Sequence, residues 1–134
     1  MSTLLVDTNV VSFLMKKIPL GLRYENLLRG NRLAISFMTV AELYEGACRG
    51  NWGEKRLRKL EREIGHYLIL PVTTEICRRW GDVRFQRRRK PISGEDAWIA
   101  AAALAFECPL VTHNPQDFRD ISRLRVLTAR DDMQ

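Results

Sequence analysis

The feature that most restricts the fold of this 134-residue chain is a regular alternation of short apolar runs with helical segments. The apolar runs, which predict strands, occupy residues 4–7, 33–36, 68–72, 110–112 and 124–128. The sequence between them favours helices at residues 8–17, 22–29, 39–49, 54–64, 74–89 and 96–107. Strands that alternate with helices form a parallel sheet covered on both faces. An α/β fold with a central parallel sheet flanked by helices is therefore predicted.

Individual residues set the expected limits of these elements. Pro19 is expected to stop the first helix, and Pro71 makes the run at 68–72 an edge strand or a strand end. The helix at 39–49 has one apolar stripe at helical spacing, made of Val40, Leu43, Tyr44 and Ala47. The helix at 96–107 is apolar nearly all round and should be buried. Residues 129–134 are expected to form a frayed tail.

Length and composition favour one soluble domain that covers residues 1–134. No apolar stretch approaches the roughly 20 residues of a membrane span, and the N-terminus lacks a signal peptide's basic segment. Cys48, Cys77 and Cys108 are odd in number and widely spaced, so reduced core thiols in a cytoplasmic protein are expected. The net charge of +6 and the pI near 9.7 favour polyanionic partners but do not choose among RNA, DNA, a membrane and an acidic protein.

Four acidic residues stand at the starts of helices: Asp7, Glu42, Asp96 and Asp117. Asp7, Glu42 and Asp117 follow strands, so these three are expected to cluster at the carboxyl edge of the sheet, where ligands bind. Asp96 opens the most apolar helix, so it should not lie far from the core. Carboxylates gathered there repel one another unless a cation compensates them. Hard oxygen ligands select Mg²⁺ or Mn²⁺, and the isolated His66 and His113 make no zinc site. This pattern predicts a metal-dependent nuclease.

The same acids have a simpler interpretation as helix caps. Glu42 follows Thr39 at the spacing of a capping box, and Asp96 follows Ser93 in the same way. Asn114 before Pro115 would cap the helix that holds Asp117. Each acid would then lie in a first turn, where the helix dipole favours negative charge.

These residues carry a resemblance to a known family. The chain resembles the PIN-domain ribonucleases, and more closely the VapC-type toxins of toxin–antitoxin pairs. The matching segments are residues 5–9 (LVDTN), 39–43 (TVAEL), 96–103 (DAWIAAAA), 110–114 (LVTHN) and the pair Asp117 and Phe118. They occur in order along nearly the whole chain.

The resemblance implies a PIN-like fold with a five-stranded parallel sheet and a Mg²⁺- or Mn²⁺-dependent endoribonuclease. Asp7, Glu42 and Asp96 then match the family's acidic metal ligands, and Asp117 matches a more variable fourth position. The polar positions that support the site are Thr8, Asn9, Thr112 and Asn114. The resemblance also implies a homodimer inhibited by a cognate VapB-like antitoxin. Glu95 departs from the pattern by placing a second acid beside Asp96.

A dense basic segment precedes Asp96. Its seven basic residues are Arg78, Arg79, Arg84, Arg87, Arg88, Arg89 and Lys90. Only Asp82 opposes them, and Trp80 and Phe85 lie among them. Because so dense a run repels itself, we expect these cations to hold the RNA backbone, although they could also dock an acidic antitoxin segment. The two aromatic residues could instead face the core.

Taken together, the sequence predicts a metal-dependent endoribonuclease that acts as the toxin of a type II toxin–antitoxin module. One alternative is a PIN-domain nuclease in RNA processing, with the same site and a different role. Another is a non-catalytic nucleic-acid-binding module whose acids are helix caps. A response-regulator receiver fits poorly, because residues 124–128 are followed by Ala129 and Arg130 instead of the lysine that it requires.

Overall fold

The computed structural model describes residues 2–130. Five strands form one parallel sheet in the order β3-β2-β1-β4-β5. Their bounds are β1 Thr3–Val6, β2 Arg32–Ser36, β3 Leu68–Leu70, β4 Leu110–Val111 and β5 Val126–Leu127. The predicted parallel sheet is confirmed, and β3 lies at an edge, as Pro71 indicated.

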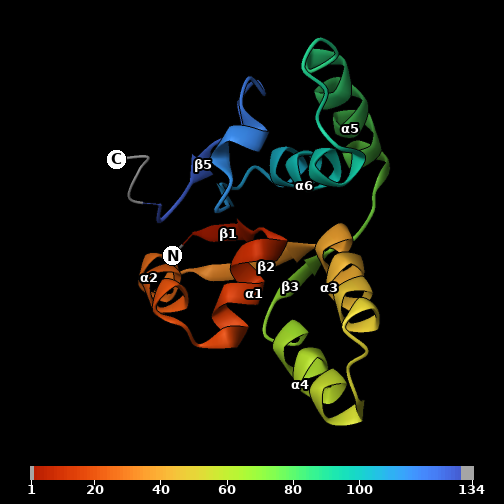
Figure 1. The fold of residues 1–134 in the computed structure, drawn as a ribbon. Coiled ribbons are helices and arrows are strands. Elements are labelled where there is room, and N and C mark those ends of the chain that lie inside the picture. Colours follow the sequence, from red (N-terminus) through yellow and green to blue (C-terminus); the bar gives the residue numbers. More distant parts are fainter. Residues whose placement is uncertain (1, 131–134) are drawn as a thin grey trace.

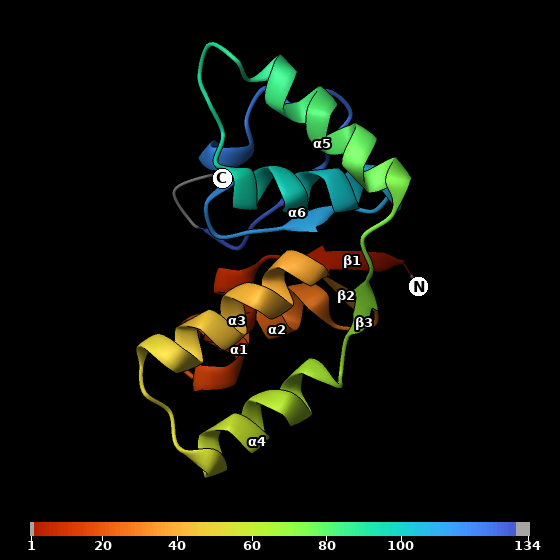
Figure 2. The same ribbon diagram turned by 90° about the vertical axis from the view of Figure 1, so that its right-hand side faces the viewer.

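Helices cover both faces of this sheet (Figure 1). The helices are α1 Thr8–Lys16, α2 Pro19–Leu28, α3 Phe37–Arg49, α4 Glu54–Ile64, α5 Thr74–Gln86 and α6 Gly94–Ala105, with a short 3-10 helix, η1, at Pro115–Phe118. Both views place α5 and α6 on one side of the sheet and α1, α2 and α4 on the other (Figure 2). The protein is thus a three-layer α/β/α structure.

The strands divide the core into two halves because successive side chains point to opposite faces. Leu5 and Leu110 pack with the α5–α6 side, whereas Val6 and Val111 pack with the α1–α4 side. The predicted buried helix is confirmed, since residues 100–103 of α6 are fully or almost fully buried. The small side chains of these alanines allow α6 to pack closely in the core.

Several predicted boundaries were wrong, and capping explains most of them. Pro19 does not simply stop the first helix. It occupies the first turn of α2, where its missing N–H costs nothing. The helix α3 begins two residues before Thr39, because the Ser36 hydroxyl accepts a hydrogen bond from the Thr39 N–H. Tyr44, predicted to lie in the buried stripe of α3, is 39% exposed.

The cysteines and the C-terminal segment also differ from expectation. Cys108 is buried, but Cys48 and Cys77 are exposed, so the prediction of three core thiols was wrong for two of them. The Arg23 guanidinium donates to the Ala129 carbonyl, so the expected frayed tail is fixed at its first residue. Residues 131–134 of that tail lie outside the described residues. Within residues 2–130, no helix combines the length and apolar character needed to cross a membrane.

Candidate active site

Asp7 stands at the junction of β1 and α1 and is only 6% exposed. One carboxylate oxygen, Oδ1, accepts the Thr8 backbone N–H at 2.8 Å and so caps α1. The other, Oδ2, accepts the Thr112 hydroxyl at 2.6 Å. Burial raises the pKa of Asp7, the two hydrogen bonds oppose this rise, and the charges of Glu42 and Asp117 add to it. A cap on a helix needs neither deep burial nor neighbouring acids.

Two of the predicted supporting residues hold Asp7 in place. Thr112 lies immediately after β4 and is fully buried. Its hydroxyl accepts the Asn114 backbone N–H at 3.1 Å while it donates to Asp7. Asn114 therefore supports the site through its main chain. Asn114 occupies the predicted N-cap position of η1, with Pro115 in the first turn, but its side chain makes no capping hydrogen bond.

Thr8 joins Asp7 to the second acid. Its hydroxyl donates to Glu42 Oε1 at 2.7 Å and lies 3.0 Å from the hydroxyl of Thr39. Glu42 is in the second turn of α3, so it is not the capping-box acid that its spacing from Thr39 suggested. Thr39 is fully buried beside these residues. The sequence assigned it only as a cap, and only its position one helical turn before Glu42 could have indicated this role.

Asp96 enters the same group from α6. It lies in the first turn, where its backbone N–H donates to the Ser93 hydroxyl at 3.0 Å, as the capping interpretation predicted. Burial raises its pKa to about 6, and the charges of Asp7 and Asp117 contribute to that rise. Asp96 is half-buried, whereas the adjacent Glu95 is exposed. Asp96 is thus the acid of this pair that lies nearer the buried group.

Glu42 and Asp117 complete the four predicted acids. Burial raises the pKa of Glu42, and the charges of Asp96, Glu95 and Glu45 add to this effect. Asp117 lies on η1, is exposed, and acts on the titration of both Asp7 and Asp96. All four acids therefore interact electrostatically at one edge of the sheet, although they come from four separate segments of the chain.

The donor set suits a hard divalent cation. Within residues 2–130, no three His, Cys, Asp or Glu side chains lie close enough together to hold a metal ion. Mg²⁺ usually keeps several waters and binds through one or two carboxylates, so it does not need three converged side chains. In addition, the side-chain oxygen of Asn9, two residues after Asp7, is buried and has no hydrogen-bond partner in the described part of the chain. The acids thus match the oxygen chemistry that Mg²⁺ and Mn²⁺ prefer.

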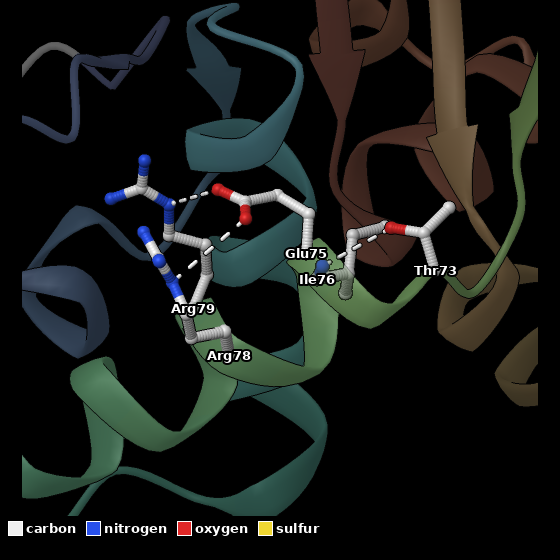
Figure 3. Close-up of polar contacts among 5 residues, drawn as sticks. All are labelled: Thr73, Glu75, Ile76, Arg78 and Arg79. Carbon is white, nitrogen blue, oxygen red and sulfur yellow. Dashed lines mark hydrogen bonds and ion pairs between the residues drawn. The ribbon is translucent and has the colours of Figure 1, made fainter.

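The basic segment is less uniform than its sequence suggested. At the start of α5, Glu75 forms ion pairs with Arg79 at 3.0 Å and with Arg78 at 3.8 Å (Figure 3). Arg79 lines a shallow cavity with Leu104 and Glu107, beyond the turn of α6 that carries Asp96. Arg78 and Arg79 therefore belong to the end of the α5–α6 pair that lies away from the acids.

The other end of α5 packs beside the first turn of α6. Arg84 donates to the Ile92 carbonyl at 2.9 Å, and Arg87 donates to the carbonyls of Lys90, Asp117 and Arg119. Arg88 stacks over Phe85, which is 65% exposed. Arg89 and Lys90 are exposed, and within residues 2–130 neither side chain makes a hydrogen bond or an ion pair.

The remaining aromatic and histidine residues have structural contacts. Trp80 stacks on Trp98 at a centroid distance of 5.1 Å, and its ring N–H donates to the Gly94 carbonyl. Trp80 thus packs inward, as the alternative interpretation proposed. His113 packs against Phe13, and its Nδ1 lies 2.6 Å from the hydroxyl of the buried Tyr24. His66 is exposed.

Comparison with known proteins agrees with this geometry. The PIN domain family model matches residues 4–124. The chain is 34% identical over 125 residues to ribonuclease VapC1 of Haemophilus influenzae, covering 90% of this chain and 93% of that protein. It is 30% identical over 124 residues to the tRNA(fMet)-specific endonuclease VapC of Salmonella typhimurium, covering 91% and 94%. The structure of VapBC-1 from nontypeable Haemophilus influenzae matches with a TM-score of 0.78 and 32% identity, covering 96% and 98%.

These matches extend over nearly all of the described fold and include each of the four acids. The chain therefore belongs to the PIN-domain family and, within it, to the VapC ribonucleases. Members of this family are nucleases that generally depend on a divalent metal ion, and VapBC structures belong to toxin–antitoxin systems.

Proposed function

We propose that this chain is a Mg²⁺- or Mn²⁺-dependent endoribonuclease that acts as the toxin of a type II toxin–antitoxin module. The metal would be held by Asp7, Glu42, Asp96 and Asp117, with Asp7 as the central ligand. The observation that carries the proposal is the buried Asp7, whose pKa is raised by burial and by other acids although two hydrogen bonds hold it. Such an arrangement is costly for stability alone and useful for binding a cation.

The residues around the acids have separate tasks in this proposal. Thr112 and the Thr8 N–H fix both oxygens of Asp7, and the Thr8 hydroxyl orients Glu42. Asp96 and Asp117 approach from α6 and η1 and add negative charge. A divalent ion would supply the Lewis acidity that lowers the pKa of water and offsets charge on the scissile phosphate. The protein's part is to hold these oxygens in place before substrate arrives.

The exposed cations at the end of α5 are proposed to hold the RNA backbone. Arg88, Arg89 and Lys90 lie where α5 meets the segment leading to Asp96, and each is exposed. Arg84 and Arg87 would shape this end of the site through their bonds to main-chain carbonyls. Arg78 and Arg79 are paired with Glu75 and would contribute little to RNA binding.

The related proteins suggest the substrate and the partner to test first. Because a relative with 30% identity is named a tRNA(fMet)-specific endonuclease, a structured RNA such as tRNA is the first substrate to try. A VapB-like antitoxin is the proposed inhibitor, since the similar solved structures are VapBC assemblies. We also propose a homodimer that acts in the cytoplasm.

The test is cleavage of a total RNA pool, and of purified tRNA, by the wild-type chain. Reactions would contain Mg²⁺, Mn²⁺ or EDTA, and Asp7→Asn would be compared with Asp82→Asn. Asp82 is an exposed acid on α5 and serves as the charge-matched control. We expect cutting by the wild type and Asp82→Asn only with metal, and none by Asp7→Asn.

Two outcomes would contradict the proposal. Cleavage that persists in EDTA, or that survives Asp7→Asn, would remove the acids from catalysis. Circular dichroism must find Asp7→Asn folded for its inactivity to count.

Expression of the wild type, with and without a cognate antitoxin, would separate a toxin from an RNA-processing nuclease, because only a toxin should arrest growth when expressed alone.

A further inference from the structure

A cavity of about 470 Å³ opens beside the acids on the α1–α4 side of the sheet. Thr8 and Glu42 line one part of it, so the cavity borders the candidate active site directly. Its volume falls in the roughly 300–1,000 Å³ range typical of small-ligand sites. A larger cavity of about 770 Å³, near α2 and the end of α4, contains none of the four acids. The smaller cavity is therefore the better candidate for a ligand site because of its position beside the acids, and not because of its size.

The part of this cavity away from Glu42 is basic and aromatic. Lys16, from the last turn of α1, and Arg56 and Lys59, from α4, line it and are all exposed. The Arg56 guanidinium lies over the Trp52 ring, 3.9 Å from the ring centroid. Since Thr8 and Lys16 are eight residues apart on one helix, the cavity runs about 12 Å along α1.

The floor between these ends is apolar and open. Met15 and Leu43 line it, together with Gly46 in the last turn of α3. A Cβ added at Gly46 would meet no atom of residues 2–130 within 4 Å. The glycine therefore leaves the groove free where most side chains would narrow it.

We propose that this groove is a subsite for single-stranded RNA that flanks the cleaved phosphodiester. Arg56, Lys59 and Lys16 would contact phosphates, and an unpaired base would stack on the Trp52–Arg56 pair. Aromatic rings and guanidinium planes are the surfaces on which proteins stack unpaired bases. Positive charge along a groove beside four carboxylates also offsets the repulsion that those acids exert on RNA. The inference rests on the proposed nuclease function and extends it to substrate recognition.

The chain itself supplies a matched control for the charges. On α4, Arg56 and Lys59 line the groove, whereas Lys55, Arg58 and Arg62 lie together on another face of the same helix. Arg56→Ala/Lys59→Ala and Lys55→Ala/Arg62→Ala each remove two positive charges from one helix. A difference between the two double variants therefore reports on position and not on net charge.

The experiment is fluorescence anisotropy with a labelled single-stranded oligoribonucleotide of about ten nucleotides, which matches common site sizes. The full chain would carry Asp7→Asn so that the probe stays intact. The quantity compared is the slope of the logarithm of the binding constant against the logarithm of the salt concentration, here called the salt slope. We expect Arg56→Ala/Lys59→Ala to lower the magnitude of this slope by about 1.4, since each single-strand phosphate contact contributes about 0.7. Lys55→Ala/Arg62→Ala should leave the slope nearly unchanged.

Two further variants test the stacking surface and the open floor. Trp52→Ala should weaken binding about tenfold, within the range for loss of one base–aromatic stack. Gly46→Gln should weaken it by filling the groove, whereas Gly46→Ala should bind as the parent does. Because the added Cβ meets open space, both glycine variants should fold.

Equal salt slopes for the two double variants, or unchanged binding by Trp52→Ala and Gly46→Gln, would overturn the proposal. If these variants bind RNA normally but lose affinity for a purified antitoxin, the groove belongs to the protein partner and the RNA assignment is wrong. Wild-type cleavage is scored separately. If the wild type cleaves RNA and the groove variants bind RNA as the parent does, the groove proposal is wrong and the nuclease proposal stands. If the groove variants bind RNA more weakly but the wild type shows no metal-dependent cleavage, the nuclease proposal is wrong and the groove still binds RNA.

Discussion

The acids at the sheet edge and the arginines of α5 were both conspicuous in the sequence, but the fold treats them differently. Asp7, Glu42 and Asp96 come from three elements and meet at one edge, where Thr8 and Thr112 hold two of them. The arginines all lie within residues 78–89, yet the fold distributes them, and several bind main-chain carbonyls or Glu75. Like charges that the fold gathers indicate function, whereas like charges that it disperses often serve the structure.

The largest effect should come from Asp96→Asn. Cleavage should fall more than about 100-fold, because even outer partners of metal ligands contribute roughly 10- to 100-fold. Without metal at neutral pH the variant should be more stable by about 1 kcal/mol, since it removes a half-buried charge whose pKa is raised to about 6. The measurements are RNA cleavage and thermal unfolding in EDTA. If Asp96→Asn lowered the unfolding temperature and lost activity only because less of it was folded, Asp96 would be only a helix-start residue.

Thr112→Val should follow in size. Asp7 would lose its 2.6 Å hydrogen bond and remain buried, so stability should fall by about 1–3 kcal/mol. Metal-dependent cleavage should fall roughly 10- to 100-fold, as for other outer partners of metal ligands. Thr112→Ser keeps the hydroxyl and should recover most activity in the same assay. Failure of serine to do better than valine would argue against this hydrogen bond.

Acid pH should reduce cleavage at subsaturating metal, because protonation of Asp96, whose metal-free pKa is about 6, competes with metal binding. Below pH 6 the loss should approach about tenfold per pH unit for one competing proton. Metal-free stability should change in the opposite sense. Between about pH 4 and pH 6 the folded state binds more protons than the unfolded state, so stability falls as the pH rises through this window. Urea unfolding in EDTA and initial cleavage rates would measure both. Parallel pH profiles would contradict this account.

Arg87→Ala should test the structural side of the comparison. Its guanidinium donates to the carbonyls of Lys90, Asp117 and Arg119, so its removal should lower stability by about 1–2 kcal/mol. Arg89→Ala is the neighbouring control and should change stability by less than about 0.5 kcal/mol. Thermal unfolding measures both variants, and equal stabilities would show that Arg87 does not fix η1 in solution.

The smallest effect is expected for Arg78→Ala/Arg79→Ala. Because both arginines pair with Glu75 away from the acids, cleavage and RNA affinity should change less than about twofold at moderate salt. The measurement is the salt dependence of RNA binding by Arg78→Ala/Arg79→Ala, compared with that by Arg89→Ala. A larger loss for Arg78→Ala/Arg79→Ala than for Arg89→Ala would restore the whole of α5 as an RNA-binding face.

The parallel sheet and the meeting of the acids could be predicted from sequence, because strand ends in such a sheet share one edge. The hydroxyl network could be predicted only in part. Thr112 was expected from the family resemblance. Thr39 was interpreted as a helix cap, but in the structure Ser36 is the cap of α3. The basic groove could not be predicted, since it needs α1, α3 and α4 to be placed in space. Counting arginines pointed to α5, although Arg56 and Lys59 line a cavity that also reaches Glu42.

The central claim is that the four acids bind a divalent metal and are not merely caps. Calorimetric titration of Mn²⁺ into the wild-type chain at neutral pH tests it most directly, beside Asp7→Asn, Asp96→Asn and Asp82→Asn. The account predicts saturable binding by the wild type and Asp82→Asn, with affinity at least about tenfold weaker in the two site variants. Equal Mn²⁺ binding by all four proteins, or none by the wild type, would contradict it.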